Sequence, residues 1–113
     1  MTVTRAALGS STHDSLRMQS KTLFGNRDRL EVVVAIARAE SDAVNAADLA
    51  YLLGLPNNRI RAQLQALASV GLLEAMPRDG SGRIWFIRRQ SGFWTACVEL
   101  SDAWERERAR LHA

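Results

Sequence analysis

The chain has 113 residues, a length that suits one domain with a single core. Hydrophobic residues make up 47% and charged residues 24%, which are ordinary values for a folded globular domain and argue against intrinsic disorder. The longest uninterrupted apolar run, 32–37, has six residues, far fewer than the ~18 that a membrane-spanning helix needs. We therefore expect a folded, cytoplasmic protein that does not associate with membranes.

Side chains that could carry a metal ion or a reaction are scarce. A single cysteine, Cys97, excludes an intramolecular disulfide and any multi-cysteine zinc site, and the two histidines, His13 and His112, stand near opposite ends. No spacing joins a nucleophile to a general base. We expect no cofactor, no metal site and no enzymatic activity. Cys97 is interpreted as a small buried hydrophobic residue, with a thiol sensor as the alternative.

Positive charge is concentrated in the middle of the chain. The net charge is +3, and 14 of the 15 cationic residues are arginine. Residues 59–89 hold six arginines and two acids, a net charge of +4, whereas residues 99–113 hold three arginines and four acids, a net charge of −1. Arginine suits bidentate contacts to phosphates and bases, although an arginine-rich coding bias would give the same count. The excess by itself is a weak indication of nucleic-acid binding.

Hydrophobic periodicity and turn residues predict a mostly helical chain with one β-hairpin. Asp14 suits the start of a helix that Gly25 ends, and Asn45 with Asp48 forms a capping pair for a later helix that Gly54 ends. The predicted elements, in chain order, are a loose arm at 1–13, helices at 15–23, 26–39, 45–53 and 56–70, strands at 72–78 and 83–89 around a turn at 79–82, and a long helix from 91 to about 111. We expect residues 14–113 to form one domain.

This α-α-α-α-β-β-α order, with a tight turn between two short helices and an arginine-containing hairpin after them, is the order of a winged helix-turn-helix domain. The stretch 49–74, from Leu49-Ala50-Tyr51 to Leu72-Leu73-Glu74, resembles prokaryotic winged-helix repressors, in particular the ArsR-like group. Residues 23–30 resemble that group's stretch before its second helix, and 82–87 its wing return strand. The resemblance covers about 15–104.

The resemblance implies a homodimeric transcriptional repressor. It places the helix at 56–70 in the DNA major groove and the first and last helices at a dimer interface. The group's metal-sensing members carry a Cys-x-Cys pair before the turn, but residues 44–48 of this chain contain no cysteine. No metal site is therefore carried over, and relief of repression is left to a small molecule, a partner protein or no effector at all.

The chemistry of the helix at 56–70 supports DNA contact independently. Ile60, Leu64 and Leu67 repeat at core spacing and leave the polar residues free for a groove. Asn and Gln side chains can pair with adenine and Arg side chains with guanine. The predicted groove-facing residues are Asn57, Asn58, Arg59, Arg61 and Gln63. A solvated helix face without a ligand is the alternative.

The predicted hairpin carries arginines on both sides of its turn. Arg78, Ser81 and Arg83 bracket the tip, where a wing would meet flanking phosphates or an adjacent minor groove. Solvated strand ends are the alternative. The glycines at 80 and 82 belong to the turn, because no Gly-Lys-Ser/Thr follows them as a nucleotide-binding loop would require.

The last predicted helix is more apolar than a surface helix of so small a domain should be. Its stripe suggests a partner helix, which we expect a second copy of the chain to supply so that two recognition helices read a pseudo-palindromic operator. The predicted interface residues are Leu16, Leu23, Phe93, Cys97, Leu100, Trp104 and Leu111. Packing within one chain is the alternative. Two other functions remain open, a winged-helix protein-interaction module and a non-specific architectural DNA-binding protein.

Overall fold

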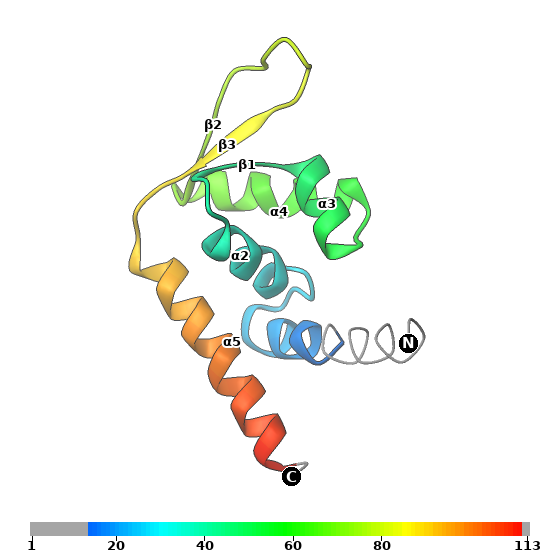
Figure 1. The fold of residues 1–113 in the computed structure, drawn as a ribbon, viewed down its shortest axis with the longest axis vertical. Helices are drawn as coiled ribbons and strands as arrows, with labels where there is room; N and C mark the ends of the chain where they lie inside the picture. The colour runs from blue at the N-terminus through cyan, green and yellow to red at the C-terminus, as the bar shows by residue number, and fades with distance from the viewer. Residues whose placement is uncertain (1–13, 112–113) are drawn as a thin grey trace.

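The computed structural model describes residues 14–111, and the predicted arm at 1–13 lies outside them (Figure 1). Helical residues 14–24 come first. The elements that follow are α2 (Arg29–Arg38), β1 (Ala43–Asn45), α3 (Ala46–Leu53), α4 (Asn57–Ser69), β2 (Leu73–Ala75), β3 (Trp85–Arg88) and α5 (Gly92–Leu111). The predicted fold class, mostly helical with a β-hairpin wing, is confirmed. Within residues 14–111 we find no helix with the length and apolarity needed to cross a membrane.

Helix α2 is the centre of the core. Leu30, Val33 and Ile36 are fully buried on it. The helix begins at Arg29 rather than at residue 26, because the Asn26 side-chain oxygen accepts the backbone N–H groups of residues 28 and 29 and holds residues 26–28 in a bend before the helix. Helix α5 packs along one side of α2, and α3 and α4 approach it from the other (Figure 1).

Two local signals build the helix-turn-helix as predicted. The Asn45 side chain accepts the backbone N–H of Asp48 at 2.9 Å, and its amide donates to the Asp48 carboxylate at 2.9 Å, so the capping pair forms. Gly54 ends α3 in the left-handed conformation, with φ at +66°. Leu55, directly after it, is buried and joins α4 to the core.

The sheet has a third strand, β1, that was not predicted from the sequence. Strand β3 lies in the middle, antiparallel to β2 on one side and to β1 on the other. Both hairpin strands are shorter than predicted, since β2 ends at Ala75 and β3 begins at Trp85. Pro77 lacks the N–H that a longer ladder would need, and the loop between the strands extends away from the helices (Figure 1).

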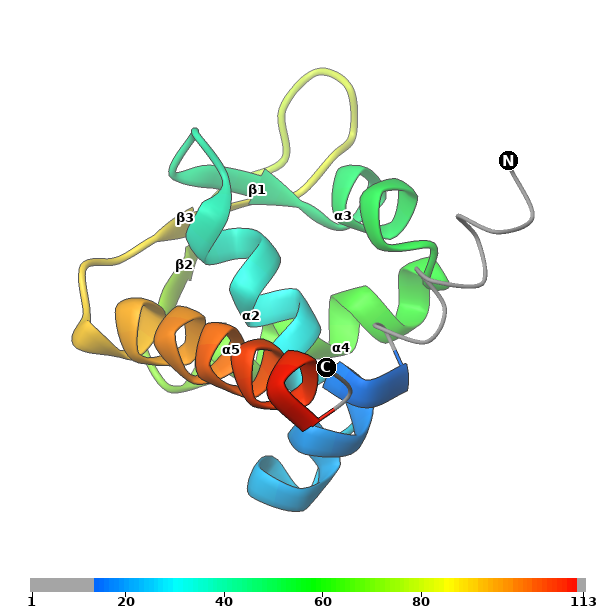
Figure 2. The same cartoon turned by 60° about the horizontal axis from the view of Figure 1, so that its bottom comes forward.

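Helix α5 is anchored at its start and runs past the helical residues 14–24 (Figure 2). Trp94 and Cys97 are buried against the core, and the Trp94 indole donates to the Arg89 carbonyl at 2.7 Å. Farther along, the Trp104 indole donates to the Ser15 hydroxyl at 2.8 Å. Much of the apolar stripe of α5 therefore packs inside one chain.

Candidate nucleic-acid interface

The exposed side of α4 and the wing enclose a recess of about 210 Å³. Three arginines line it, Arg61 from α4 and Arg78 and Arg83 from the wing. Asn57 and Gln65 of α4 add polar side chains that can donate and accept hydrogen bonds. Among the described residues that line the recess none is acidic, so its charge favours an anionic ligand.

Helical geometry explains how α4 reaches both the core and the recess. Residues 57, 61 and 65 follow at intervals of four and share one face of the helix. Ile60 and Leu64 are fully buried on the adjoining face. The Arg61 guanidinium makes no hydrogen bond or ion pair with any residue in the range 14–111, which leaves all of its donors available to a ligand.

Both wing arginines make contacts that are exposed to solvent. Arg78 donates to the Gly82 carbonyl at 2.6 Å across the turn, and Arg83 contacts the Asp48 carboxylate at 3.3 Å. About half of the Arg83 side chain is exposed, and Asp48 is more exposed still. An exposed pair of this kind contributes little to stability, so Arg83 can exchange Asp48 for a phosphate at small cost.

Asp79 organises the wing turn. Its carboxylate accepts the Ser81 backbone N–H at 2.9 Å, the Ser81 hydroxyl at 2.5 Å and the Trp85 indole N–H at 2.8 Å. These hydrogen bonds, the one from the Ser81 hydroxyl first, lower the pKa of Asp79 to about 2 from its usual value near 3.8. Since the Ser81 hydroxyl gives its one proton to Asp79, this side chain has no donor left for the phosphate contact that the sequence analysis assigns to it.

The wing turn is expected to titrate at an unusually low pH. The pKa of Asp79 is depressed in the folded chain. Its contribution to the stability of the folded wing turn is therefore fully present above about pH 3.8 and is lost as the pH falls through about 2. The indole N–H resonance of Trp85, followed by NMR, should therefore shift with a midpoint near pH 2.

The matching resonance of Trp94 is the control, because that indole donates to a backbone carbonyl and reports whether the chain is still folded. A Trp85 midpoint near 3.8 would show that Asp79 does not accept the indole proton in solution.

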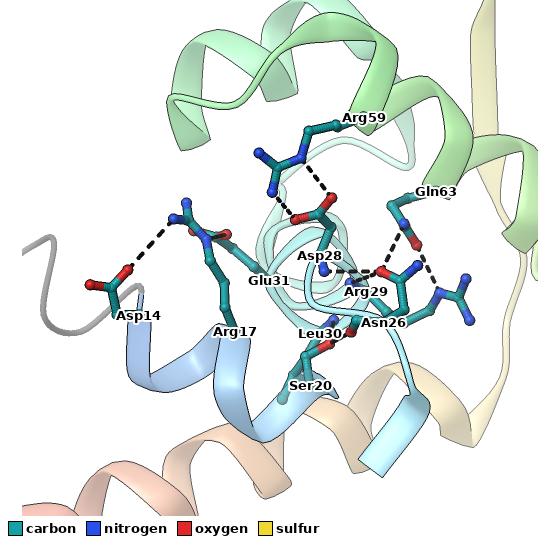
Figure 3. A network of polar contacts seen from close by, with 10 residues as sticks. All are labelled: Asp14, Arg17, Ser20, Asn26, Asp28, Arg29, Leu30, Glu31, Arg59 and Gln63. Atoms are coloured by element: carbon teal, nitrogen blue, oxygen red, sulfur yellow. Dashed lines mark hydrogen bonds and ion pairs between the residues drawn. The ribbon is translucent and has the colours of Figure 1, made fainter. Parts of the chain in front are cut away.

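Two residues predicted to face the groove are held elsewhere (Figure 3). Gln63 is only 4% exposed, because its amide donates to Asn26 at 3.0 Å and its oxygen accepts from Arg29 at 2.8 Å. The prediction that Gln63 lies free on the groove face is wrong. Arg59 lies on the flank of α4 that faces α2, and it binds the Asp28 carboxylate through two nitrogens, Nε at 2.9 Å and Nη2 at 2.5 Å. Its pKa is raised by the hydrogen bond to Asp28.

Gln65, Ala46 and Ala47 line the recess although they are not among the predicted DNA-binding residues. Gln65 is exposed two turns after Asn57, at the i+8 position of the same face, so the spacing was a usable signal. Ala46 and Ala47, the first residues of α3, also line the recess and bring a helix N-terminus to its wall. The positive end of a helix dipole favours a bound anion, and the Asn45 cap marks that end in the sequence.

The predicted interface residues divide into an inner and an outer group. Cys97 is 4% exposed, and its burial within the chain raises the thiol pKa, so it is a core residue rather than an available interface residue. Leu16, Phe93 and Trp104 are half-buried against their own chain. Leu23, Leu100 and Leu111 are exposed, and Met18 lies exposed on the same pair of helices. The Gln19 amide donates to the Leu100 carbonyl at 3.4 Å and joins these two helices.

The chain is similar to several solved structures, although its sequence matches no known family. No protein-family model matches the chain, and no curated protein does. Wild-type MarR from E. coli in its apo form is similar with a TM-score of 0.66 and 15% identity, over 90% of this chain and 77% of MarR. AbsC, a MarR family transcriptional regulator from Streptomyces coelicolor, is similar with a TM-score of 0.64 and 15% identity, over 93% of this chain and 74% of AbsC.

A third solved structure, the antimony-specific transcriptional repressor AntR, gives a TM-score of 0.61 and 25% identity, over 79% of this chain and 76% of AntR. The three comparisons cover 79%, 93% and 90% of this chain. The chain therefore has the winged helix fold of these transcriptional regulators.

Proposed function

We propose that this chain is a binding protein rather than an enzyme, a sequence-specific regulator of transcription that binds double-stranded DNA. The recess between α4 and the wing carries the proposal, because it gathers Arg61, Arg78 and Arg83 with no acidic side chain among its described lining residues. Phosphate contacts supply most of the affinity in such complexes, and polar side chains on the inserted helix supply the base preference.

In the proposed complex α4 enters the major groove and the wing lies on the flanking DNA. Arg61, Asn57 and Gln65 face the bases or the groove edge, with Asn58 exposed beside them. Arg78 and Arg83 face phosphates. Arg59 stays with Asp28 on the far flank, where its outer nitrogens can reach a backbone phosphate.

We further propose that the chain acts as a homodimer and represses transcription by covering its operator. Exposed leucines on helical residues 14–24 and on α5, together with Met18, support a self-association surface at Leu23, Leu100 and Leu111. A two-fold pair of chains would set two α4 helices about one DNA turn apart. The similar solved structures include MarR family members and so do not favour the ArsR-like group. The ArsR-like assignment therefore rests on the sequence resemblance alone.

An effector, if one relieves repression, has a place to bind in the single chain. A groove of about 510 Å³ runs between α2 and α3 and is walled largely by aliphatic side chains, including Val34, Leu49 and Leu53. Its size falls within the range of small-molecule sites. A small apolar compound is the ligand that this lining would accept.

The proposal is tested by selecting bound duplexes from sheared genomic DNA with the purified protein. We expect an inverted repeat with half-sites about one helical turn apart, bound with an affinity that falls steeply between two salt concentrations in anisotropy titrations. Sedimentation at micromolar concentration should show a dimer. Salt-sensitive binding without any enriched sequence would instead favour an architectural protein, and absence of DNA binding would favour a protein-interaction module.

A further inference from the structure

The amino-terminal part of α4 is fastened to the segment that precedes α2 (Figure 3). The first attachment is the fork between Arg59 and Asp28, in which two guanidinium nitrogens meet the two carboxylate oxygens. The Asp28 side chain is 13% exposed and that of Arg59 42%. A two-point fork of this kind fixes the direction of the arginine as well as its distance.

The second attachment lies one turn farther along α4. The Gln63 amide donates to the Asn26 side-chain oxygen, and the same oxygen accepts the backbone N–H groups of residues 28 and 29. Arg29 donates to the Gln63 oxygen at 2.8 Å, so Gln63 is held from both ends of its amide. All these contacts are made with residues 26–29, which we call the α4 seat.

The two attachments, at residues 59 and 63, restrain α4 more than a single attachment would. A single contact fixes a point on a helix and leaves it free to turn about that point. A second contact one turn away, on the same flank, fixes the direction of the helix axis. Together with the buried Ile60 and Leu64 on the adjoining face, it opposes rotation of the helix. Each residue of a helix turns by about 100°, so even a modest rotation changes how Arg61 and Gln65 face the recess. Base recognition tolerates orientation errors of only about 10–20°.

The α4 seat is itself held in place by helical residues 14–24. The Ser20 hydroxyl, fully buried, accepts the Leu30 backbone N–H at 2.9 Å and donates to the Asn26 carbonyl. Arg17 bonds to the buried carboxylate of Glu31 in the first turn of α2 at 3.0 Å. The seat is thus joined to the rest of the fold rather than being a loop that would move with α4.

We propose that Asn26 and Asp28 are positioning residues for DNA recognition, which set the rotation of α4 and thereby the choice of DNA sequence. This inference rests on the proposed function. Asn26 and Asp28 act through Arg59 and Gln63. They affect the ratio of affinities for different DNA sequences more than the overall affinity for DNA. If the ion pair only stabilised the fold, its loss would change the affinity for every DNA sequence equally.

The test compares Asp28→Asn with Asp42→Asn. Both replacements remove one negative charge, but Asp42 pairs with Arg88 at 2.7 Å, at the other end of α2 and away from α4. Amide hydrogen exchange is measured first, on the protein without DNA. Asp28→Asn should speed exchange over residues 59–63 and leave α5 unchanged, whereas Asp42→Asn should leave α4 as it is. Unchanged exchange in α4 would overturn the proposal.

Affinity is then measured for a duplex selected by the wild-type protein and for a shuffled duplex of the same composition. We expect Asp28→Asn to lower the ratio of the two affinities about 10-fold or more, with the affinity for the shuffled duplex changed less than about threefold. Equal changes for both duplexes would mean that Asp28 acts only through its charge, and would refute the proposal.

Gln63→Met provides a second route if Asp28→Asn folds poorly, because methionine keeps the side-chain length and removes both amide bonds. The same loss of sequence discrimination is expected, and retained discrimination with unchanged exchange would overturn the proposal. If no duplex can be selected at all, the proposed function fails. The exchange measurement needs no DNA and still decides whether the seat holds α4.

Discussion

Replacing Arg61 with alanine is expected to weaken binding of the selected duplex by roughly 1–3 kcal/mol, which is about 5- to 150-fold in Kd. Arg61 is exposed on the recess face of α4, and its guanidinium has no partner among the described residues, so a ligand receives its full hydrogen-bonding capacity. If it reads a guanine, the loss should be concentrated on the selected sequence and smaller on a shuffled one. Anisotropy titrations on both duplexes measure the difference.

Arg106→Ala is the matched control for this experiment. It removes the same charge from an exposed position in the second half of α5, away from the recess. We expect it to change Kd less than about twofold at moderate salt, because long-range attraction is screened over about 8–10 Å. Equal losses for the two variants would show that Arg61 contributes only net charge, and the recess would then not be the DNA-binding site.

Trp94→Ala should lower the free energy of unfolding by about 3–5 kcal/mol, a large part of the 5–15 kcal/mol available to a domain. The indole is 6% exposed, packs edge-on against Phe93 with ring centroids 5.5 Å apart, and bonds to the Arg89 carbonyl. Its loss leaves a cavity where α5 begins and removes the indole donor from the Arg89 carbonyl. Urea denaturation followed by circular dichroism measures the change.

Leu111→Ala serves as the comparison, since Leu111 is 63% exposed near the end of α5. Within a single chain this replacement should change stability by no more than about 0.5 kcal/mol. The contrast separates the two interpretations of the apolar stripe on α5. If Trp94→Ala left stability intact but dissociated a dimer in sedimentation, Trp94 would belong to an interface between chains rather than to the core.

The parts of the fold that local chemistry determines were predictable from the sequence. Asn45 and Asp48 are close enough to cap one another, and Gly54 occupies a left-handed position that few other residues adopt without strain. Strand β1 has no such local signal. Its three residues are extended because they pair with β3, which lies some forty residues farther along the chain.

The same reasoning explains which site residues were predictable. Polarity and spacing place Arg61 and Asn57 outward, and both line the recess. Gln63 is equally polar, but it lies beside Leu64 at the edge of the buried face, where an amide can be satisfied by Asn26 and Arg29. A sequence pattern shows that a side chain needs a hydrogen-bond partner, without showing whether solvent, DNA or another part of the chain supplies it. The apolar stripe of α5 has the same ambiguity.

The central place of β3 has a consequence for how the molecule folds. A two-stranded hairpin is only marginally stable in water, and β3 gains its second neighbour from β1, with Ala43 opposite Ile87. That pairing closes a chain segment containing both α3 and α4, a long loop with a correspondingly high entropic cost. We therefore expect the wing to become ordered late, after the helices have brought the two ends of that segment together. The pairing of Ala43 with Ile87 then marks the completion of folding.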